Sequence, residues 1–214
     1  MLARPLVRPD PQQLFGETPA VLGEALKDGV NLAVWRRQLH PHLADFAQRL
    51  VSSGDLLAES LTIELDTDGA VPAFNLATAY QDLAGHAGFV ADISWLVGAF
   101  ACLLEARVVG LRLRILDKAM CPRFHVDHAP LRLITTYAGA ASQWLREDVI
   151  PRHHLGKTAA EPIDVSDIEQ LHTGEVALFK GERWQGNEGA GIVHRSPQVE
   201  PGERRLILTL DWLA

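Results

Sequence analysis

The sequence predicts an α+β fold in which N-terminal helices pack on a C-terminal jelly roll. The strongest helical pattern runs from Phe89 to Leu104, where apolar residues recur on one face. After Arg107 the pattern changes to alternation of apolar and polar residues, as in a strand with one wet face. Short strand-like segments with Gly and Pro between them then continue to the end of the chain, which is typical of a sandwich or jelly roll.

The 214 residues fit one domain, and we expect residues 1–214 to fold as a single unit. Within it, residues 1–106 form a mainly helical part. Residues 107–214 form the β-rich jelly-roll core that carries the functional site.

Two patterns organise the N-terminal part. Residues 19–50 carry apolar side chains at helical spacing, interrupted near Pro41, and predict helix. Residues 61–65 alternate leucine and isoleucine with polar residues and predict a strand.

Composition and charge exclude several classes of partner. The formal net charge is −7, whereas a nucleic-acid-binding surface normally needs a basic face. The longest mostly apolar run, Ile93 to Leu104, is shorter than the roughly 20 residues that a membrane-spanning helix needs. The N-terminal residues show no apolar core of signal-peptide length. With only two cysteines, we expect a cytoplasmic protein without a disulfide framework, and without a nucleic-acid or membrane partner.

A candidate metal centre begins in the stretch FHVDHAPLRL. His125 and Asp127 are two residues apart, so in an extended chain both side chains lie on the same face. A second strand-like segment far downstream, GIVHRSP, supplies His194. Two imidazoles and one carboxylate hold a divalent ion and leave half of its coordination sphere free, as in the facial triad of Fe(II) enzymes.

An arginine ten residues after His194 is the candidate for binding an anionic cosubstrate. Residues 206, 208, 210 and 212 form the more uniformly apolar of the two alternating sets in the last strand. Arg204 shares their parity, so we predict that Arg204 points inward and Arg205 outward. A guanidinium beside a metal would match one carboxylate of a dicarboxylate bidentately.

The segment GEVALF, followed by His194, Val199, Gly202 and Arg204, resembles the C-terminal signature of Fe(II)/2-oxoglutarate-dependent oxygenases. The resemblance implies a double-stranded β-helix of the cupin-like type and an oxygenase of the hydroxylase kind. It implies that His125, Asp127 and His194 bind Fe(II), and that Arg204 binds the 2-oxoglutarate carboxylate.

Most of the chain is also similar to a bacterial family catalogued as domain of unknown function 1826. The similarity rests on NLAVWRR, MCPRFHVDHAPLRLITTYAG and KGERWQGNEGAGIVHRSP. The family name supplies no activity.

Several interpretations remain open at this level. Cys121, four residues before His125, is either a zinc ligand or a buried thiol, and Tyr137 is a candidate second cosubstrate residue by position. The glycine-rich residues 180–191 form either a substrate-contacting loop or an ordinary hairpin connection. The alternative functions are a non-catalytic zinc-binding protein and a sensor of small acids. For the oxygenase, the substrate is a small molecule or a protein.

Overall fold

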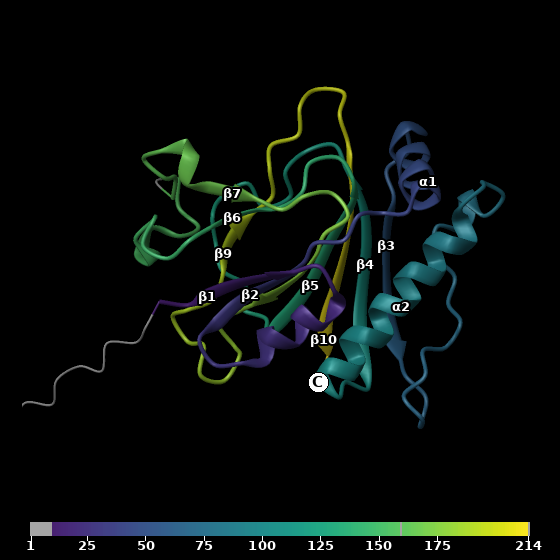
Figure 1. Cartoon of the computed structure of the whole chain (residues 1–214). Helices are drawn as coiled ribbons and strands as arrows, with labels where there is room; N and C mark the ends of the chain where they lie inside the picture. The colour runs from purple at the N-terminus through teal and green to yellow at the C-terminus, as the bar shows by residue number, and fades with distance from the viewer. Residues whose placement is uncertain (1–9, 159, 214) are drawn as a thin grey trace, which may run out of the picture.

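Two sheets, a mixed seven-stranded one and an antiparallel three-stranded one, form a jelly roll in the computed structural model, which describes residues 10–158 and 160–213 (Figure 1). The larger sheet has the order β1-β2-β8-β5-β10-β4-β3. Its strands are β1 (Gln12–Gly16), β2 (Val30–Trp35), β8 (Val176–Lys180), β5 (Leu131–Ala138), β10 (Arg205–Leu213), β4 (Val108–Leu116) and β3 (Ala58–Glu64). The smaller sheet has the order β7-β6-β9, from β7 (Ile168–Gln170), β6 (Gln143–Leu145) and β9 (Val193–Arg195).

From β4 onward the chain alternates between the two sheets. It leaves β4, touches the small sheet through an isolated bridge between His125 and His194, and returns to the large sheet as β5. It then crosses to β6 and β7, back to β8, across to β9 and finally back to β10. This alternation is the path of a double-stranded β-helix, so the predicted α+β fold with a jelly-roll core is confirmed.

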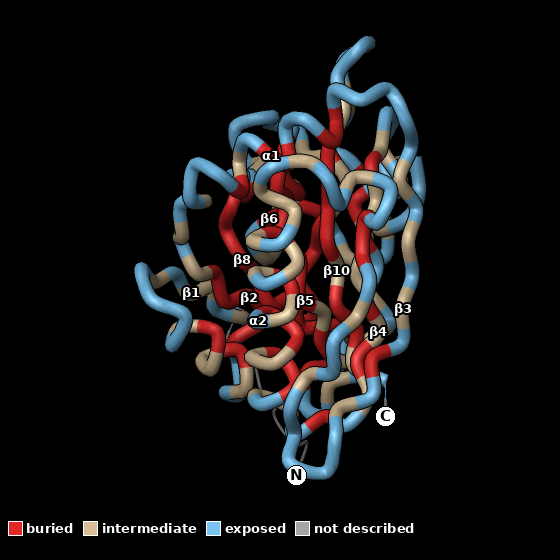
Figure 2. The backbone as a smooth tube through the Cα atoms, turned by 90° about the vertical axis from the view of Figure 1, so that its right-hand side faces the viewer, coloured by how far each residue is buried: buried red, intermediate tan, exposed pale blue. Residues whose placement is uncertain are grey.

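Helices cover the outer face of the large sheet (Figure 1). They are α1 (Pro41–Ser52), α2 (His86–Leu104) and the 3-10 helix η1 (Pro19–Leu26); the short 3-10 helices η2 (Thr78–Tyr80), η3 (Arg152–His154) and η4 (Val165–Asp167) lie in connections. The central strands of the large sheet are buried along their length (Figure 2). They are buried because the helices cover one face and the small sheet covers the other.

Alternate residues of each central strand therefore enter two different cores. In β10, Leu206, Leu208 and Leu210 pack in the core shared with the helices, whereas Ile207 packs in the core between the two sheets. The helix-side core holds most of the large aliphatic and aromatic side chains. We call the space between the two sheets the barrel interior.

Helix α2 packs on the outer face of the large sheet, as the sequence predicts. Phe89, Ile93, Val97 and Phe100 are fully buried in the helix-side core. By length and composition α2 could also cross a membrane, but core helices meet the same criterion, and this apolar face packs on the sheet.

The helical prediction for residues 30–35 is wrong, because this segment is strand β2. It pairs with β8 on one side and β1 on the other, and five of its six residues are buried. A strand buried on both faces has no alternation, and its apolar run can match helical spacing by chance. The strand expected at residues 61–65 is confirmed as part of β3.

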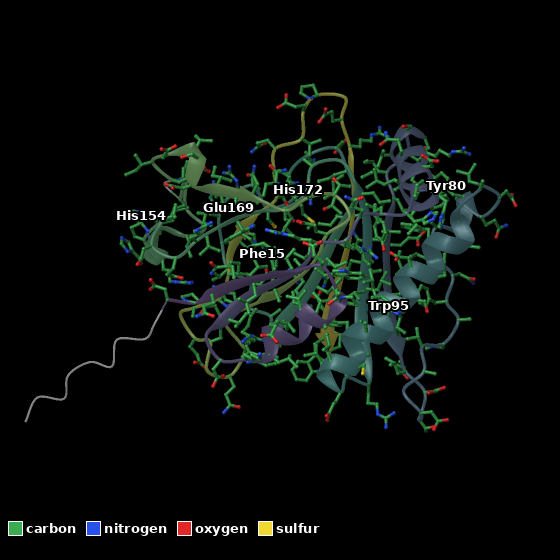
Figure 3. All side chains as sticks on the ribbon, viewed as in Figure 1. Phe15, Tyr80, Trp95, His154, Glu169 and His172 are labelled. Atoms are coloured by element: carbon green, nitrogen blue, oxygen red, sulfur yellow. The ribbon has the colours of Figure 1, made fainter. Side chains whose placement is uncertain are left out.

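A buried ion pair holds α2 against the sheet. Arg37, which follows β2, donates two hydrogen bonds to the Asp92 carboxylate of α2, at 2.7 and 3.0 Å, and one to the carbonyl oxygen of Gly174. The Tyr137 hydroxyl of β5 donates to the same carboxylate at 2.6 Å. Trp35 and Trp95 meet beside this network with ring centroids 5.6 Å apart, and Figure 3 shows Trp95 on α2.

Replacing Asp92 with alanine should destabilise the fold strongly. The change leaves the Arg37 guanidinium, whose side chain is 9% exposed, without its carboxylate. Removing one partner of a buried pair costs about 3–5 kcal/mol of the free energy of unfolding. Urea denaturation measures the loss. The control is Glu169→Ala, which breaks the exposed pair with Arg146 and should cost about 1 kcal/mol or less. Equal losses in the two variants would contradict the structural role of Asp92.

Candidate metal centre

His125, Asp127 and His194 meet at one end of the barrel interior. A backbone bridge holds the two histidines side by side: the His125 N–H donates to the His194 carbonyl oxygen at 3.0 Å, and the His194 N–H donates back at 2.9 Å. Asp127 lies two residues further on, before β5 begins. One ligand atom from each residue lies within 4.8 Å of the other two. The structure thus brings together the three side chains that the sequence selects.

Both imidazoles present Nε2 to the centre of this group. The Nδ1 atom of His125 lies 2.9 Å from the Arg123 carbonyl oxygen, and that of His194 lies 3.1 Å from the Ile192 carbonyl oxygen. A carbonyl oxygen can only accept, so we assign the ring proton to Nδ1 in each case. The Nε2 lone pairs are then free for an ion, which is the usual arrangement of a metal-binding histidine.

Burial keeps His194 neutral. Its ring packs edge-on against Phe179, with centroids 4.7 Å apart, and only 5% of the residue is exposed. The pKa of His194 is lowered to about 4, chiefly by burial; Asp127 opposes this shift, and the neighbouring His125 adds to it. A neutral imidazole at physiological pH is the form that binds a metal.

Asp127 is also held by a chain of ion pairs that runs through Arg132 and Asp211 to Arg112. Arg132 donates to Asp127 Oδ2 at 2.7 Å and, through Nε, to Asp211 Oδ1 at 2.6 Å. Arg112 donates to the other oxygen of Asp211 at 2.8 Å. Burial acts to lower the pKa of Arg132, but Asp127 and Asp211 outweigh burial and raise this pKa. Arg132 and Asp211 were not identified from the sequence as part of the site.

The loop at residues 180–191 holds the backbone of Asp127 in place through hydrogen bonds. The Glu182 N–H donates to the Asp127 carbonyl oxygen at 2.9 Å, and the Gly181 N–H donates to the Pro130 carbonyl oxygen at 3.0 Å. The Asn187 side chain, which is buried, donates to the Gly181 carbonyl oxygen. The loop is therefore hydrogen-bonded in place. Lys180 points to the helix side, where its Nζ donates to the Lys27 carbonyl oxygen at 2.7 Å.

Arg205, and not Arg204, points into the barrel interior, so the predicted orientation of these two arginines is wrong. Arg205 is fully buried, and its nearest polar groups are the hydroxyls of Thr136 and Ser142, each 3.4 Å from Nη2. Arg204 is partly exposed beside α1, in a surface hollow that Gln48 also lines. The strand parity was right, but the apolar set faces the helices rather than the barrel interior.

The Arg205 guanidinium lacks a matching anion. Its Nε and Nη1 atoms are buried and make no hydrogen bond, and no carboxylate among residues 10–158 and 160–213 lies within ion-pair distance. Burial lowers the pKa of Arg205 to about 10, so it is charged at neutral pH. A buried unpaired charge is costly, and the site therefore fits a bound anion.

The three candidate ligands His125, Asp127 and His194, which we call the triad, and Arg205 line the same surface of the barrel interior. His194 pairs with Trp144 in the register of β9 and β6, and Ser142, which contacts Arg205, lies two residues further along from Trp144. Two residues of extended chain span about 7 Å. A short dicarboxylate is long enough to reach from a metal at the triad to the Arg205 guanidinium.

Tyr137 and Cys121, which the sequence offered as further site residues, lie outside the group formed by the triad and Arg205. Tyr137 is fully buried on the helix side, where burial and Asp92 raise its pKa well above the usual value, so it does not face the barrel interior. The pairing of β5 with β10 skips Tyr137, but the alternation along β5 continues: Tyr137 faces the helix side, as Leu131 and Leu133 do, and Thr136 faces the barrel interior, as Ile134 does. Cys121 is exposed and is not among the three side chains that meet at the metal centre.

A family model described as "Protein of unknown function (DUF1826)" matches residues 16–211 of the chain. No curated protein matches it. Among solved structures, the chain is similar to a Pseudomonas putida prolyl-4-hydroxylase, with 12% identity, a TM-score of 0.47, and coverage of 90% of this chain and 96% of the other. It is also similar to a rice dioxygenase for auxin oxidation, with 14% identity, a TM-score of 0.48, and coverage of 90% and 76%.

Replacing Gly181 with alanine should weaken metal binding. A Cβ atom at this position would lie 2.1 Å from the Ala129 carbonyl oxygen and 2.6 Å from that of Asp127, so the backbone that carries the ligand must move. Disturbing the support of a ligand typically costs about 10–100-fold in metal affinity. Calorimetric titration with Co(II) measures this. Gly23→Ala, where the nearest atom is 3.9 Å away, is the control and should bind as the wild type does. Unchanged affinity in Gly181→Ala would show that the loop does not position Asp127.

Proposed function

We propose that this chain, which belongs to the DUF1826 family of proteins of unknown function, is an Fe(II)/2-oxoglutarate-dependent oxygenase of the hydroxylase type. His125, Asp127 and His194 would hold the ion. Arg205 takes the role of cosubstrate anchor that the sequence assigned to Arg204. The donor set of two neutral imidazoles and one carboxylate suits Fe(II) and leaves positions open for exchangeable ligands.

The observation that carries this proposal is the unpaired Arg205 in the same interior as the triad. A metal-binding protein without a cosubstrate has no need for a buried guanidinium that faces inward without an anion. A dicarboxylate that chelates the metal at one end would present its other carboxylate to Arg205. The free Nε and Nη1 atoms, together with Nη2, can donate to that carboxylate in the planar geometry that favours such pairs.

The chain itself contributes orientation and exclusion of water. When bound, Fe(II) and 2-oxoglutarate would together supply the activation of oxygen. Trp144, Phe179 and Ile207, which are all buried in the barrel interior, keep water away from the path between the triad and Arg205. Thr136 and Ser142 orient the guanidinium through their hydroxyls.

A structural zinc site is the weaker candidate. Such sites normally have four protein ligands, often including cysteine. Among the described residues the group contains three ligands, and the Cys121 thiol is exposed outside it. Three ligands with open positions are typical of a reactive centre rather than a closed structural one.

Arg205→Met should abolish 2-oxoglutarate binding while it leaves metal binding nearly intact. The change removes a charge-assisted bidentate pair, so the affinity for 2-oxoglutarate should fall roughly 100-fold or more. Anaerobic titration of the Fe(II) protein with 2-oxoglutarate measures this, through the visible charge-transfer band of the chelate. Co(II) titration reports metal binding separately.

The matched control is Arg204→Met, which alters the neighbouring guanidinium beside α1 and should leave the charge-transfer titration unchanged. An unaltered titration in Arg205→Met, or the absence of a band in the wild type with both Fe(II) and 2-oxoglutarate, would contradict the proposed function.

A further inference from the structure

The two oxygens of Asp127 are nearly equivalent towards the histidines. Oδ1 lies 3.8 Å from His125 Nε2, and Oδ2 lies 3.7 Å from His194 Nε2. On these distances alone, an ion between the imidazoles could take either oxygen or chelate both. Carboxylates bind divalent ions in both ways, with one oxygen or with two.

Arg132 makes the two oxygens different. Its Nη1 atom donates to Oδ2 at 2.7 Å, the length of a strong charge-assisted hydrogen bond, and it makes no such bond to Oδ1. The guanidinium draws negative charge towards Oδ2 and repels a second cation from that side of the carboxylate. Oδ1 is therefore left as the better donor to an ion.

The position of Arg132 is itself fixed. Arg132 and Asp211 are direct cross-strand partners of β5 and β10, and the Arg132 Nε donates to Asp211 Oδ1 at 2.6 Å. Only 10% of the Asp211 side chain and 22% of the Arg132 side chain are exposed. The planar guanidinium is thus held between two carboxylates on opposite sides, and it cannot turn away from Asp127 without breaking a buried pair.

We propose that Arg132 is a positioning residue that restricts Asp127 to one-oxygen coordination. This inference rests on the metal centre of the proposed function. With three single-atom protein ligands, an octahedral ion keeps three open positions, whereas a chelating Asp127 would leave two. A cosubstrate that chelates through two atoms, and oxygen as a further ligand, need all three positions. Arg132 thereby sets how many small ligands the centre can accept at once.

The number of water molecules bound to Mn(II) tests the inference without cosubstrate or turnover. Mn(II) prefers octahedral oxygen-rich coordination, and the relaxation of water protons reports how many waters it binds. The wild-type protein should hold about three waters on the ion, and Arg132→Met about one fewer, since Asp127 can then chelate. Arg132→Lys, which retains a cation and a donor, should restore the wild-type number. Thermal unfolding of each metal-free variant checks that it is folded.

Arg114→Met is the matched control. Arg114 lies on β4 and donates to Ser60 and to backbone carbonyl groups rather than to Asp127 or Asp211, so the water number should not change. If Arg132→Met is unfolded, Asp211→Asn replaces it: this change removes the charge that anchors Arg132, and the water number should fall below that of the wild type.

The outcomes separate the two proposals. A wild-type water number in folded Arg132→Met, or in Asp211→Asn where that variant is used, overturns the role of Arg132 and leaves the oxygenase proposal standing. Wild-type protein that binds no Mn(II), Co(II) or Fe(II) overturns the metal centre and both proposals with it. A metal-bound wild type without a 2-oxoglutarate charge-transfer band, but with the expected loss of a water in Arg132→Met, supports the role of Arg132 alone.

Discussion

Burial of the large sheet on both of its faces is the constraint on which the site depends. Every residue of a central strand must suit either the helix-side core or the barrel interior, because neither face is open to solvent. Polar side chains on these strands therefore need partners. On the helix side, Tyr137 finds its partner in Asp92, and Asp92 is in turn held by Arg37. That network is complete within the chain, so it contributes stability and not a binding site.

In the barrel interior, by contrast, one arginine is paired within the described chain and another is not. Arg132 is neutralised by two carboxylates within the chain, while Arg205 has none within ion-pair distance among the described residues. Under the proposed function, binding of 2-oxoglutarate would offset the cost of the unpaired Arg205 and would couple the stability of the interior to its ligand. A structural role for Arg205 would have been served at less cost by an apolar residue of similar volume.

The sequence was sufficient to predict the triad and insufficient to orient the strand that follows. The two-residue spacing of His125 and Asp127 and the strand-like segment around His194 both survive in the structure, because strand geometry fixes which side chains share a face. Parity separates Arg204 from Arg205 equally well, but parity alone does not say which face is the barrel interior. The all-leucine face of β10 meets the helices, and the mixed face of Arg205, Ile207 and Asp211 meets the small sheet. A layer that holds a polar site is marked by its mixed composition, and that signal was present in the sequence. The strand nature of β2 and the pairing of Arg132 with Asp211 depend on contacts between distant segments, which local pattern does not contain.

The position of the triad would also make a bound metal part of the architecture. His194 belongs to the small sheet through β9, whereas Asp127 is bound through Arg132 and Asp211 to the large sheet. His125 joins the small sheet by its backbone bridge. An ion held by all three would connect the two sheets at the end where the chain crosses between them. Binding of such an ion favours the closed arrangement of the sheets by the same free energy with which that arrangement favours the ion. The support that Arg132 and the loop at residues 180–191 give to Asp127 would therefore serve both the coordination of such an ion and the spacing of the two sheets around Arg205.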